Sequence, residues 1–295
     1  MEPFFKRLKR DPIIVSDGAI GSVLIGSNLP KTRCPEEHNI SNLEILEDIA
    51  LQYLQAGAEI IQTNTFGGSP LKLSDYSLDN KTEEINTNAV KAVKNAIKGK
   101  AYISGSCGPS GKILKPYGSL DPEDLYESYY RQINILVNSG VDIICVETMT
   151  DLSEAQSAIK AAKDISPSIP VMATMTFDKT PRGFFTIMGT DIKTASKGLE
   201  EAGADVIGSN CGNGIDNMVL IAEEFSKITD LPVIIQSNAG LPVIKDGKII
   251  YQEGPDFMAE RIKRLKDLNI SIIGGCCGTT PSHIKAFREA VDSLN

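Results

Sequence analysis

The chain of 295 residues is 41% hydrophobic and carries a formal net charge of −8 at pH 7, with an isoelectric point near 5.0. This length allows a substantial core, in one large domain or two smaller ones. The acidic balance argues against nucleic acid or an acidic membrane surface as the main partner, since both repel a negative protein, and favours a small molecule or a protein.

The amino terminus and the cysteines indicate the compartment. Residues Met1 to Arg10 are charged, no apolar core of signal-peptide length follows them, and no run of 18 apolar residues occurs in the sequence. We therefore expect a soluble, cytoplasmic protein. In that compartment the six cysteines are expected to be buried thiols or metal ligands, and not a disulfide framework.

Residues 1 to 12 form a polar lead-in, after which one pattern recurs along the chain: a short apolar run that ends in polar residues and glycine. Such runs are typical of buried strands that end in a tight turn. The eight strand candidates are Ile13–Ala19, Glu59–Phe66, Tyr102–Gly108, Ile143–Met149, Val171–Phe177, Val206–Cys211, Val233–Ala239 and Ser271–Cys276.

Segments with helical spacing of apolar residues lie between these runs. Several end in a phrase such as Ala56-Gly57-Ala58-Glu59, in which the glycine permits a left-handed helix end that leads into the next strand. The predicted helices are Leu43–Ala56, Glu83–Ile97, Pro122–Asn138, Leu152–Lys163, Ile192–Ala202, Asn217–Lys227, Asp256–Leu268 and Pro281–Leu294.

Eight strand-then-helix units predict parallel strands with right-handed crossovers, and eight such strands close a barrel. We therefore predict an α/β fold, a single (β/α)8 TIM barrel domain over residues 1–295. A doubly wound open sheet is the competing architecture. The chain has neither a G-x-G-x-x-G turn after the first strand nor a G-x-x-x-x-G-K-[ST] loop, which weakens the nucleotide-binding version of that alternative.

The active site of such a barrel lies at the carboxyl ends of its strands, so the last residues of each run matter most. Many of them are polar where a plain core strand would be apolar. The predicted rim residues are Asp17, Asn64, Cys107, Glu147, Thr176, Cys211, Asn238, Cys276 and Cys277.

Three cysteines of this rim point to a metal. Barrel closure brings Cys211, at the end of the sixth strand, close to Cys276 and Cys277, at the end of the eighth. Adjacent side chains on a strand point to opposite faces, so the pair converges only if the backbone leaves the regular pleat, which the neighbouring glycines permit. Three thiolates with one exchangeable position suit a catalytic zinc, whereas the alternative is a set of buried, inert thiols.

The remaining candidate ligands are assigned differently. Cys34 and Cys145 are interpreted as structural, and Cys107, at a strand end, is left open. His38 and His283 lie in a loop and a helix, away from the strand ends, and are not expected to bind a metal.

Two carboxylates end strands on the same rim. Asp17 and Glu147 would be costly to bury in a barrel mouth unless they meet a cation or hydrogen-bond donors. A substrate ammonium group supplies both. The alternative is that either acid caps a turn or pairs with a lysine, and the Asp17-Gly18 context is itself turn-like.

With these features in place, the chain resembles the homocysteine S-methyltransferase family, and most of all the homocysteine-binding domain of the cobalamin-dependent methionine synthases. The last of the matching stretches is specific, and the others are strong as an ordered set. They are Asp17–Ser22, Pro35–Asn39, Thr63–Gly67, Gly108–Gly111, Val146–Thr148, Met175–Phe177, Asn238–Gly240 and Gly274–Pro281.

The resemblance implies a zinc ion on Cys211, Cys276 and Cys277, with Asn238 in the fourth position before substrate arrives. It also implies that Asp17 and Glu147 hold the amino acid part of homocysteine. A thiol bound to such a zinc is deprotonated at neutral pH and stays nucleophilic, so these cysteines would carry the catalysis of methyl transfer that yields methionine.

Two departures from the family pattern leave the metal set intact: His38 stands at a position where an apolar residue is usual, and Ser22 where threonine is usual.

The methyl donor stays open between two classes. The resemblance favours methylcobalamin, carried by a corrinoid domain of a longer enzyme or by a separate corrinoid protein. Direct use of S-methylmethionine or betaine is the alternative. Gly278 follows the cysteine pair where enzymes that use S-methylmethionine are expected to carry arginine, which tilts the interpretation towards the corrinoid.

Two other functions remain in view. One is a barrel that binds an amino acid without chemistry. The other is an unrelated barrel enzyme, such as an aldolase, which rests on fold analogy alone. None of the eight predicted strands contains a lysine for a Schiff base, which counts against that aldolase.

Overall fold

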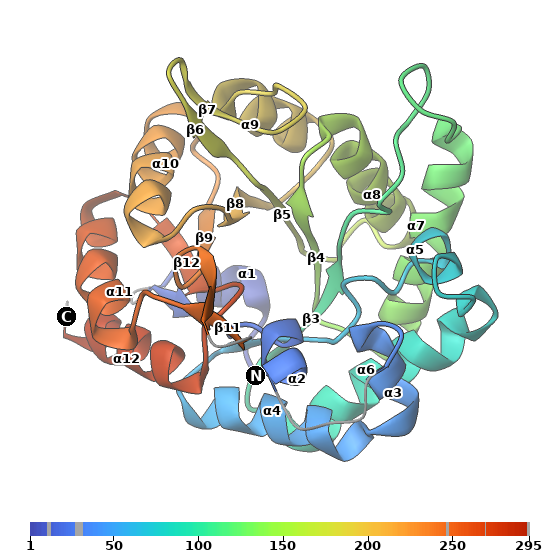
Figure 1. The fold of residues 1–295 in the computed structure, drawn as a ribbon, viewed down its shortest axis with the longest axis horizontal. Coiled ribbons are helices and arrows are strands. Elements are labelled where there is room, and N and C mark those ends of the chain that lie inside the picture. Colours follow the sequence, from blue (N-terminus) through green and yellow to red (C-terminus); the bar gives the residue numbers. More distant parts are fainter. Residues whose placement is uncertain (11–12, 27–31, 246–247, 269, 294–295) are drawn as a thin grey trace.

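The computed structural model describes residues 1–10, 13–26, 32–245, 248–268 and 270–293. Eight parallel strands form one sheet in the order β1-β12-β9-β8-β5-β4-β3-β2, which is the order of a barrel (Figure 1). The strands are β1 (Ile14–Val15), β2 (Ile60–Gln62), β3 (Tyr102–Cys107), β4 (Ile143–Met149), β5 (Val171–Met175), β8 (Val206–Cys211), β9 (Val233–Ser237) and β12 (Ile270–Gly275).

The first and second strands close the cylinder. Ser16 pairs with Ile60 in a parallel bridge, and the backbone N–H of Asp17 donates to the carbonyl of Ile60 at 3.0 Å. On the other edge of β1, Ile14 and Val15 pair with β12. The predicted (β/α)8 barrel is confirmed, and the open doubly wound sheet is excluded.

The main helices surround the barrel, and several short helices fill the connections. The main helices are α4 (Leu43–Gln55), α6 (Thr82–Ile97), α7 (Pro122–Ser139), α8 (Leu152–Ile165), α9 (Ile192–Glu201), α10 (Ile215–Ile228), α11 (Pro255–Ile262) and α12 (Pro281–Asp292). The short helices are α1 (Phe4–Leu8), α2 (Gly21–Gly26), α3 (His38–Ser41), α5 (Pro70–Ser74), η1 (Pro35–Glu37), η2 (Asp79–Lys81) and η3 (Lys263–Leu268).

The ends of the predicted helices shift by one or two residues, with one larger difference. The segment expected to be helical from Asp256 to Leu268 continues as an α-helix only to Ile262 and then tightens into η3. The last helix ends at Asp292, and the predicted end at Leu294 lies outside the described residues. Among the described residues, no helix combines the length and hydropathy needed to cross a bilayer.

The amino-terminal segment is not the polar lead-in that the sequence suggests. Phe4 of α1 is buried against Tyr102, with ring centroids 5.4 Å apart. The Arg7 guanidinium, which is also buried, pairs with both carboxylate oxygens of Glu59 at 2.7 Å. The prediction was wrong because the many charged residues of this short segment gave no sign in the sequence that Phe4 is buried.

Helix α1 covers the amino-terminal end of the barrel interior. The buried cluster at this end takes one residue or more from every strand of the barrel, together with Phe4. Its members are Phe4, Ile14, Ile60, Tyr102, Ile143, Cys145, Met172, Val206, Ile234 and Ile272. A separate, larger apolar cluster fills the space between the strands and the surrounding helices.

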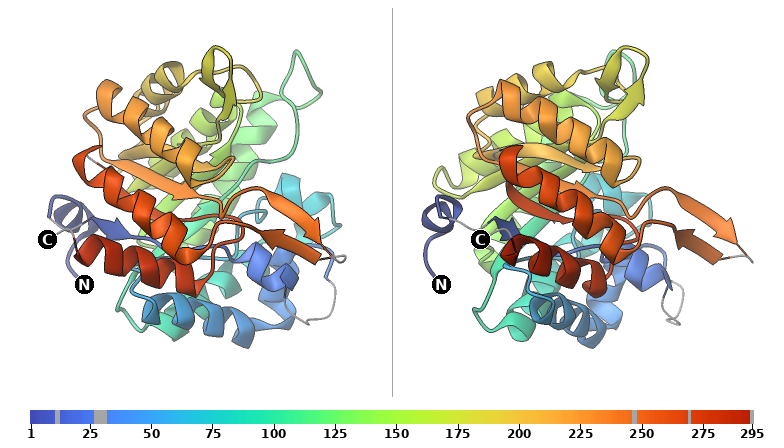
Figure 2. Two further views of the ribbon diagram at one scale, coloured as in Figure 1. Left: turned by 60° about the vertical axis from the view of Figure 1, so that its left-hand side comes forward. Right: turned by 90° about the vertical axis from the view of Figure 1, so that its left-hand side faces the viewer.

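Two antiparallel hairpins were not predicted, and both follow strand ends on the opposite side of the barrel from α1. One pairs β6 (Asp178–Thr180) with β7 (Gly183–Phe185), and the other pairs β10 (Pro242–Lys245) with β11 (Lys248–Tyr251). The β10–β11 hairpin projects beyond the barrel, at the end of the molecule away from both termini (Figure 2). Their polar and apolar residues form runs too short to separate from loops by pattern alone.

Candidate active site

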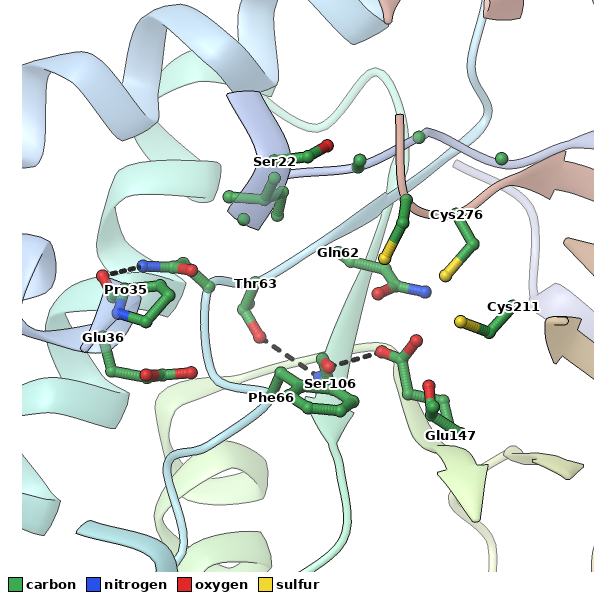
Figure 3. Close-up of a pocket in the computed structure, with 18 residues that line it drawn as sticks. Ser22, Pro35, Glu36, Gln62, Thr63, Phe66, Ser106, Glu147, Cys211 and Cys276 are labelled. Carbon is green, nitrogen blue, oxygen red and sulfur yellow. Dashed lines mark hydrogen bonds between the residues drawn. The ribbon is translucent and has the colours of Figure 1, made fainter. Parts of the chain in front are cut away.

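A cavity of about 200 Å³ opens at the carboxyl ends of the strands. Its lining comes from segments that follow β1 and β2 and from the ends of β3, β4, β8 and β12, and Figure 3 shows these side chains around it. Of the predicted rim residues, those that line the cavity are Asn64, Glu147, Cys211, Cys276 and Cys277.

The structure brings the three predicted cysteines together on one side of this cavity. The Sγ atoms of Cys211, Cys276 and Cys277 all lie within 4.8 Å of one another. A tetrahedral zinc with Zn–S bonds of about 2.3 Å needs sulfurs about 3.8 Å apart, so small side-chain adjustments suffice. Among the residues that the structure describes, this is the one group of three or more potential ligands close enough to hold a metal.

Backbone irregularities produce this convergence. Cys211 has φ of 66°, in the left-handed region that is unusual for a residue other than glycine. Strand β12 ends at Gly275, so both Cys276 and Cys277 lie in the turn beyond it and are released from the alternation of a strand. Gly278, with φ of 82°, completes the turn.

Strand β9 holds the cysteine turn in place, although it contributes no thiol. The N–H of Cys276 donates to the carbonyl of Ser237 at 2.8 Å, and the N–H of Ala239 donates to the carbonyl of Cys277 at 3.0 Å. Thr279 Oγ1 adds a bond to the carbonyl of Cys276 at 2.7 Å. The turn is therefore fixed from both sides before any ligand binds.

The thiols influence one another's protonation. Hydrogen bonds from Cys276 and Cys277 lower the pKa of Cys211, whereas the bond with Cys211 raises the pKa of Cys276. The three groups thus titrate together, and the thiolate that forms first is stabilised by hydrogen bonds from the other two thiols.

Glu147 lies next to the thiols on the wall of the cavity (Figure 3). Its Oε1 accepts a hydrogen bond of 2.5 Å from Ser106 Oγ. Burial raises the pKa of Glu147 to about 7, the Ser106 bond opposes this rise, and the neighbouring Cys211 adds to it. A carboxylate with this environment is poised to gain a cation, because an ammonium group would offset the cost of burying its charge.

Asp17 lies deeper than the prediction assumed. Its side chain is 1% exposed and does not line the main cavity, but borders a void of about 10 Å³ beside it. The carboxylate accepts the N–H of Gln62 at 2.7 Å and the hydroxyl of Ser16 at 3.2 Å. Desolvation is the main reason that its pKa is raised to about 7, with a further contribution from Glu147.

Asn238 lies beside Cys211 with one half of its amide engaged. Its Nδ2 donates to the carbonyl of Gly212 at 2.8 Å. Its Oδ1 is buried and has no hydrogen-bond partner among the described residues. A buried acceptor without a partner is costly, and because Asn238 lies beside Cys211 this oxygen is a candidate ligand for a group bound at the thiols.

The other cysteines and the histidines fall outside the cluster. Cys34, Cys107 and Cys145 are all buried, and none belongs to the described metal-binding group. His38 is the first residue of α3 and not part of a loop, and its ring nitrogens contact Thr32 and Asn42.

His283 lies in the first turn of α12, where its ring takes part in the capping box with Thr280. The other ring nitrogen contacts the carbonyl of Glu253 at 3.0 Å. Both nitrogens are therefore occupied by structural contacts.

Three residues near the site were not assigned a role from the sequence. Glu36 lines the cavity and accepts the N–H of Gly67 at 2.7 Å. Asn210 is fully buried at the end of β8, between the cysteines and Glu147. The sequence feature that could have indicated Asn210 is its position directly before Cys211. For Glu36 the only such feature is its place in the stretch Pro35–Asn39, which matches the family.

Tyr251, the third, comes from the β10–β11 hairpin and packs over the cysteine turn. A Cβ atom at Gly278 would lie 2.1 Å from the Tyr251 ring, and Gly278 has a positive φ. Glycine is therefore required at this position by both space and backbone conformation. No sequence pattern links Tyr251 to Gly278, because the hairpin itself was not predicted.

The sequence and the fold of this chain are similar to those of known proteins. The sequence model of the family described as homocysteine S-methyltransferase matches residues 14–291. The chain belongs to the homocysteine S-methyltransferase family. As a member of this family it has relatives called methionine synthase in two mycobacteria. It is 30% identical to the protein of Mycobacterium leprae and 31% identical to that of Mycobacterium tuberculosis, over 96% of its own length.

The chain spans only 24% and 25% of these two relatives, so about three quarters of each has no counterpart here. Among solved structures, the metallated form of the homocysteine methyltransferase MmuM from Escherichia coli superimposes with a TM-score of 0.80. The match covers 98% of this chain and 99% of MmuM at 20% sequence identity, which establishes a shared fold. The oxidized form of MmuM gives a TM-score of 0.77.

Proposed function

We propose that this member of the homocysteine S-methyltransferase family transfers a methyl group to the thiol of homocysteine and so forms methionine, with residues 1–295 acting as a single barrel domain. The observation that carries the proposal is the cluster of Cys211, Cys276 and Cys277, within 4.8 Å, on the wall of a cavity that also contains a buried carboxylate. The family membership of the chain and the names of its relatives support the same reaction.

The residues fit a zinc ion held by the three thiolates. The sulfur spacing is close to that of a tetrahedral site, and Asn238, beside Cys211 with an unpartnered Oδ1, is the candidate for a fourth ligand that substrate can displace. When bound, zinc keeps a substrate thiol deprotonated and nucleophilic at neutral pH. The same cavity wall, Gly275 to Cys277, is then where the substrate sulfur would lie.

The acidic residues bind and orient the rest of the substrate. Glu147 faces the cavity, and its raised pKa drops when an ammonium group approaches, so the charged form is used for binding. Asp17 is assigned the same role through the small void beside Gln62. A cavity of about 200 Å³ suits a small amino acid and is below the roughly 300 Å³ at which sites for larger ligands begin.

In the reaction, the sulfur of homocysteine forms a bond to the methyl carbon while the bond between that carbon and its carrier breaks. The thiol proton is released to solvent. The protein contributes alignment, because the sulfur and the amino group are held by neighbouring groups on the wall of one cavity.

We propose methylcobalamin on a corrinoid domain or partner protein as the methyl donor. Its support is an apolar collar, which we define as the exposed large apolar side chains in the loops, the short helix α2 and the β10–β11 hairpin that lie between β1, β2, β3, β7 or β9 and the next main helix. Its members are Ile25, Phe66, Ile113, Tyr117, Ile187, Met188, Leu241, Ile244, Ile249 and Ile250. A small onium donor needs no exposed apolar side chains around the mouth of the barrel, whereas a protein that carries the donor can bury them when it docks.

The alternative donors are S-methylmethionine and betaine. The sequence argument against them was Gly278 in place of arginine, and Tyr251 supports it, because its ring lies where a larger side chain at 278 would start.

The decisive experiment offers homocysteine with a methylated corrinoid protein, with S-methylmethionine and with betaine, in parallel, and measures methionine. We expect zinc-dependent methionine formation from the corrinoid alone. Methionine formed only from an onium compound would overturn the proposed donor. Full activity in protein stripped of metal by a chelator would overturn the proposed mechanism, and no methionine from any donor would favour the non-catalytic amino-acid-binding barrel.

The proposed location is the cytoplasm. Three thiols within 4.8 Å, one of them with a lowered pKa, would form a disulfide in an oxidising compartment. A reducing compartment keeps them available for a metal.

A further inference from the structure

Asn210 is the most highly connected polar side chain between the cysteines and the buried acid. It is 0% exposed and lies at the end of β8, next to Cys211. Its Oδ1 accepts the N–H of Thr148 and the hydroxyl of Thr174, each at 2.8 Å. Because a backbone N–H can only donate, these bonds determine which end of the amide is the oxygen.

The opposite end of the amide therefore faces the site as a donor. Nδ2 lies 2.7 Å from Thr148 Oγ1, 3.4 Å from Glu147 Oε2 and 3.8 Å from Cys276 Sγ. One hydrogen of Nδ2 is available to the hydroxyl of Thr148, and the other is shared between the Glu147 carboxylate and the Cys276 sulfur. One amide thus contacts both halves of the proposed site.

The backbone that Asn210 contacts is strained. Thr148 has φ of 60°, a conformation that is rare for a β-branched residue, and Cys211 has φ of 66°. The pairing of β4 with β5 shifts register between Val146 and Met149, which is where Glu147 leaves the regular strand. Asn210 bonds both the N–H and the hydroxyl of Thr148, so it holds the conformation that directs Glu147 into the cavity.

We propose that Asn210 is a positioning residue that fixes the distance between the substrate-binding carboxylate of Glu147 and the metal-binding sulfur of Cys276. The inference rests on the proposed function, because the roles of those two residues are assigned there. Asn210 itself need not touch substrate or metal. Asn210 couples the metal site to the amino acid site. Loss of its amide therefore disturbs metal binding and amino acid binding together, although different segments of the barrel carry the two sites.

The test uses the full chain with Asn210→Ala and Asn210→Asp, and Ser209→Ala as the matched control. Ser209 is the adjacent residue on β8, is 0% exposed, and has a hydroxyl without a partner among the described residues. Co²⁺ serves as the metal probe, because thiolate-to-cobalt absorption reports the geometry of the sulfurs. Homocysteine affinity is measured by calorimetry on the metal-loaded protein, which requires no methyl donor.

We expect Asn210→Ala to weaken Co²⁺ binding about tenfold, the size typical of a lost contact to a metal ligand, and to shift the absorption band. We expect homocysteine affinity to fall about tenfold as well, through the freed Glu147. Asn210→Asp should be worse in both respects, because an anion then faces Glu147 and Cys276. Ser209→Ala should match the wild type.

Unchanged Co²⁺ affinity, absorption band and homocysteine affinity in folded Asn210→Ala would overturn the proposal. If Asn210→Ala does not fold, Thr148→Ala provides the test, because it removes one acceptor of the Asn210 amide. Co²⁺ affinity and homocysteine affinity should then fall, and the absorption band should shift, by a smaller amount than in Asn210→Ala. Wild-type values in Thr148→Ala would overturn the coupling. Failure of the proposed function is recognised separately, because the wild-type protein would then bind neither Co²⁺ nor homocysteine. In that case hydrogen exchange at the Thr148 amide tests the positioning role. Faster exchange in Asn210→Ala would support this role, and unchanged exchange would refute it.

Discussion

The two ends of the barrel interior are built from the same kind of strand position and serve opposite purposes. At the amino-terminal end, inward-facing residues such as Ile60 and Ile234 form an apolar cluster closed by Phe4. Two residues further along the same strands stand Gln62 and Gln236, which lie in the polar half of the interior. The first end is packed and satisfied, whereas the second is polar and partly unsatisfied.

The apolar end stabilises the fold, whereas the polar end carries the groups that can do chemistry. The polar end has two carboxylates with pKa values raised to about 7, Asp17 and Glu147, and two non-glycine residues with positive φ, Thr148 and Cys211. Each of these features costs folding free energy. The apolar end compensates, so changes at the two ends should separate function from stability.

The largest expected effect is on activity, from Cys276→Ala. This change removes one of three sulfurs at the polar end, so methyl transfer should fall by more than about a hundredfold, since even contacts behind a metal ligand are worth 10–100-fold. Bound zinc, measured by elemental analysis, should fall in parallel. The thermal midpoint of metal-free protein should stay close to that of the wild type.

Cys107→Ala is the matched control, because Cys107 is a fully buried cysteine at the end of β3 that lies outside the cluster. It should lose some stability and keep its zinc. Normal zinc content in Cys276→Ala would contradict the assignment of the metal site.

Phe4→Ala should have the largest effect on stability. It removes the aromatic ring that closes the apolar end, and buried phenylalanine truncations cost about 3–5 kcal/mol of unfolding free energy. Urea denaturation measures this loss. Co²⁺ affinity at the other end should be unchanged.

Phe5→Ala provides the comparison, since Phe5 is 40% exposed and adjacent in the same helix. Its unfolding free energy should stay within about 0.5–1 kcal/mol of the wild type. Equal losses in the two variants would show that α1 does not plug the barrel.

The third prediction concerns pH. Because the pKa of Glu147 is about 7 in the folded protein, compared with the 4.5 of an unperturbed glutamate in the unfolded chain, the folded protein binds the extra proton between these values. The free energy of unfolding therefore falls as pH rises from about 4.5 to 7, by on the order of 3 kcal/mol. Glu147→Gln carries no such proton and should lack this part of the fall.

Urea titrations of the metal-free protein at pH 5 and pH 8 measure the difference. Glu84→Gln, on the exposed face of α6, should retain the wild-type pH dependence. If Glu147→Gln and the wild type lose equal stability between these pH values, the carboxyl of Glu147 is already ionised at pH 5.

The smallest effect is expected at the apolar collar. Ile244→Asp places a charge on the projecting hairpin, where Ile244 is 82% exposed, so folding and zinc content should not change. The rate of methyl transfer from a corrinoid protein should fall about fivefold, the effect of a contact worth about 1 kcal/mol at an interface. Transfer from free methylcobalamin should be unaffected.

Leu51→Asp tests whether any added charge has this effect, because Leu51 is 38% exposed on α4 and belongs to no part of the collar. A reduction of similar size in both variants, or in neither, would remove the support that the collar lends to a protein-bound donor.

The architecture was accessible from the sequence because its signals are local. Each apolar run, and each glycine that ends a helix, depends on a few neighbouring residues, and eight repeats of one pattern left few alternatives to a barrel. The rim residues followed from topology: once the strands are parallel, their carboxyl ends share one side. That reasoning also brought Cys211 near Cys276 and Cys277.

Only the tertiary structure decided how the rim operates. The burial that raises the pKa of Asp17, the contacts of Asn210 with β4, β5 and the turn after β12, and the approach of Tyr251 to Gly278 all join residues far apart in the chain. Desolvation and contact distance depend on the closed barrel, not on neighbours in sequence. The amino acid order therefore determined which groups reach the mouth of the barrel, and the packing of the whole determined their distances, their charges and their partners.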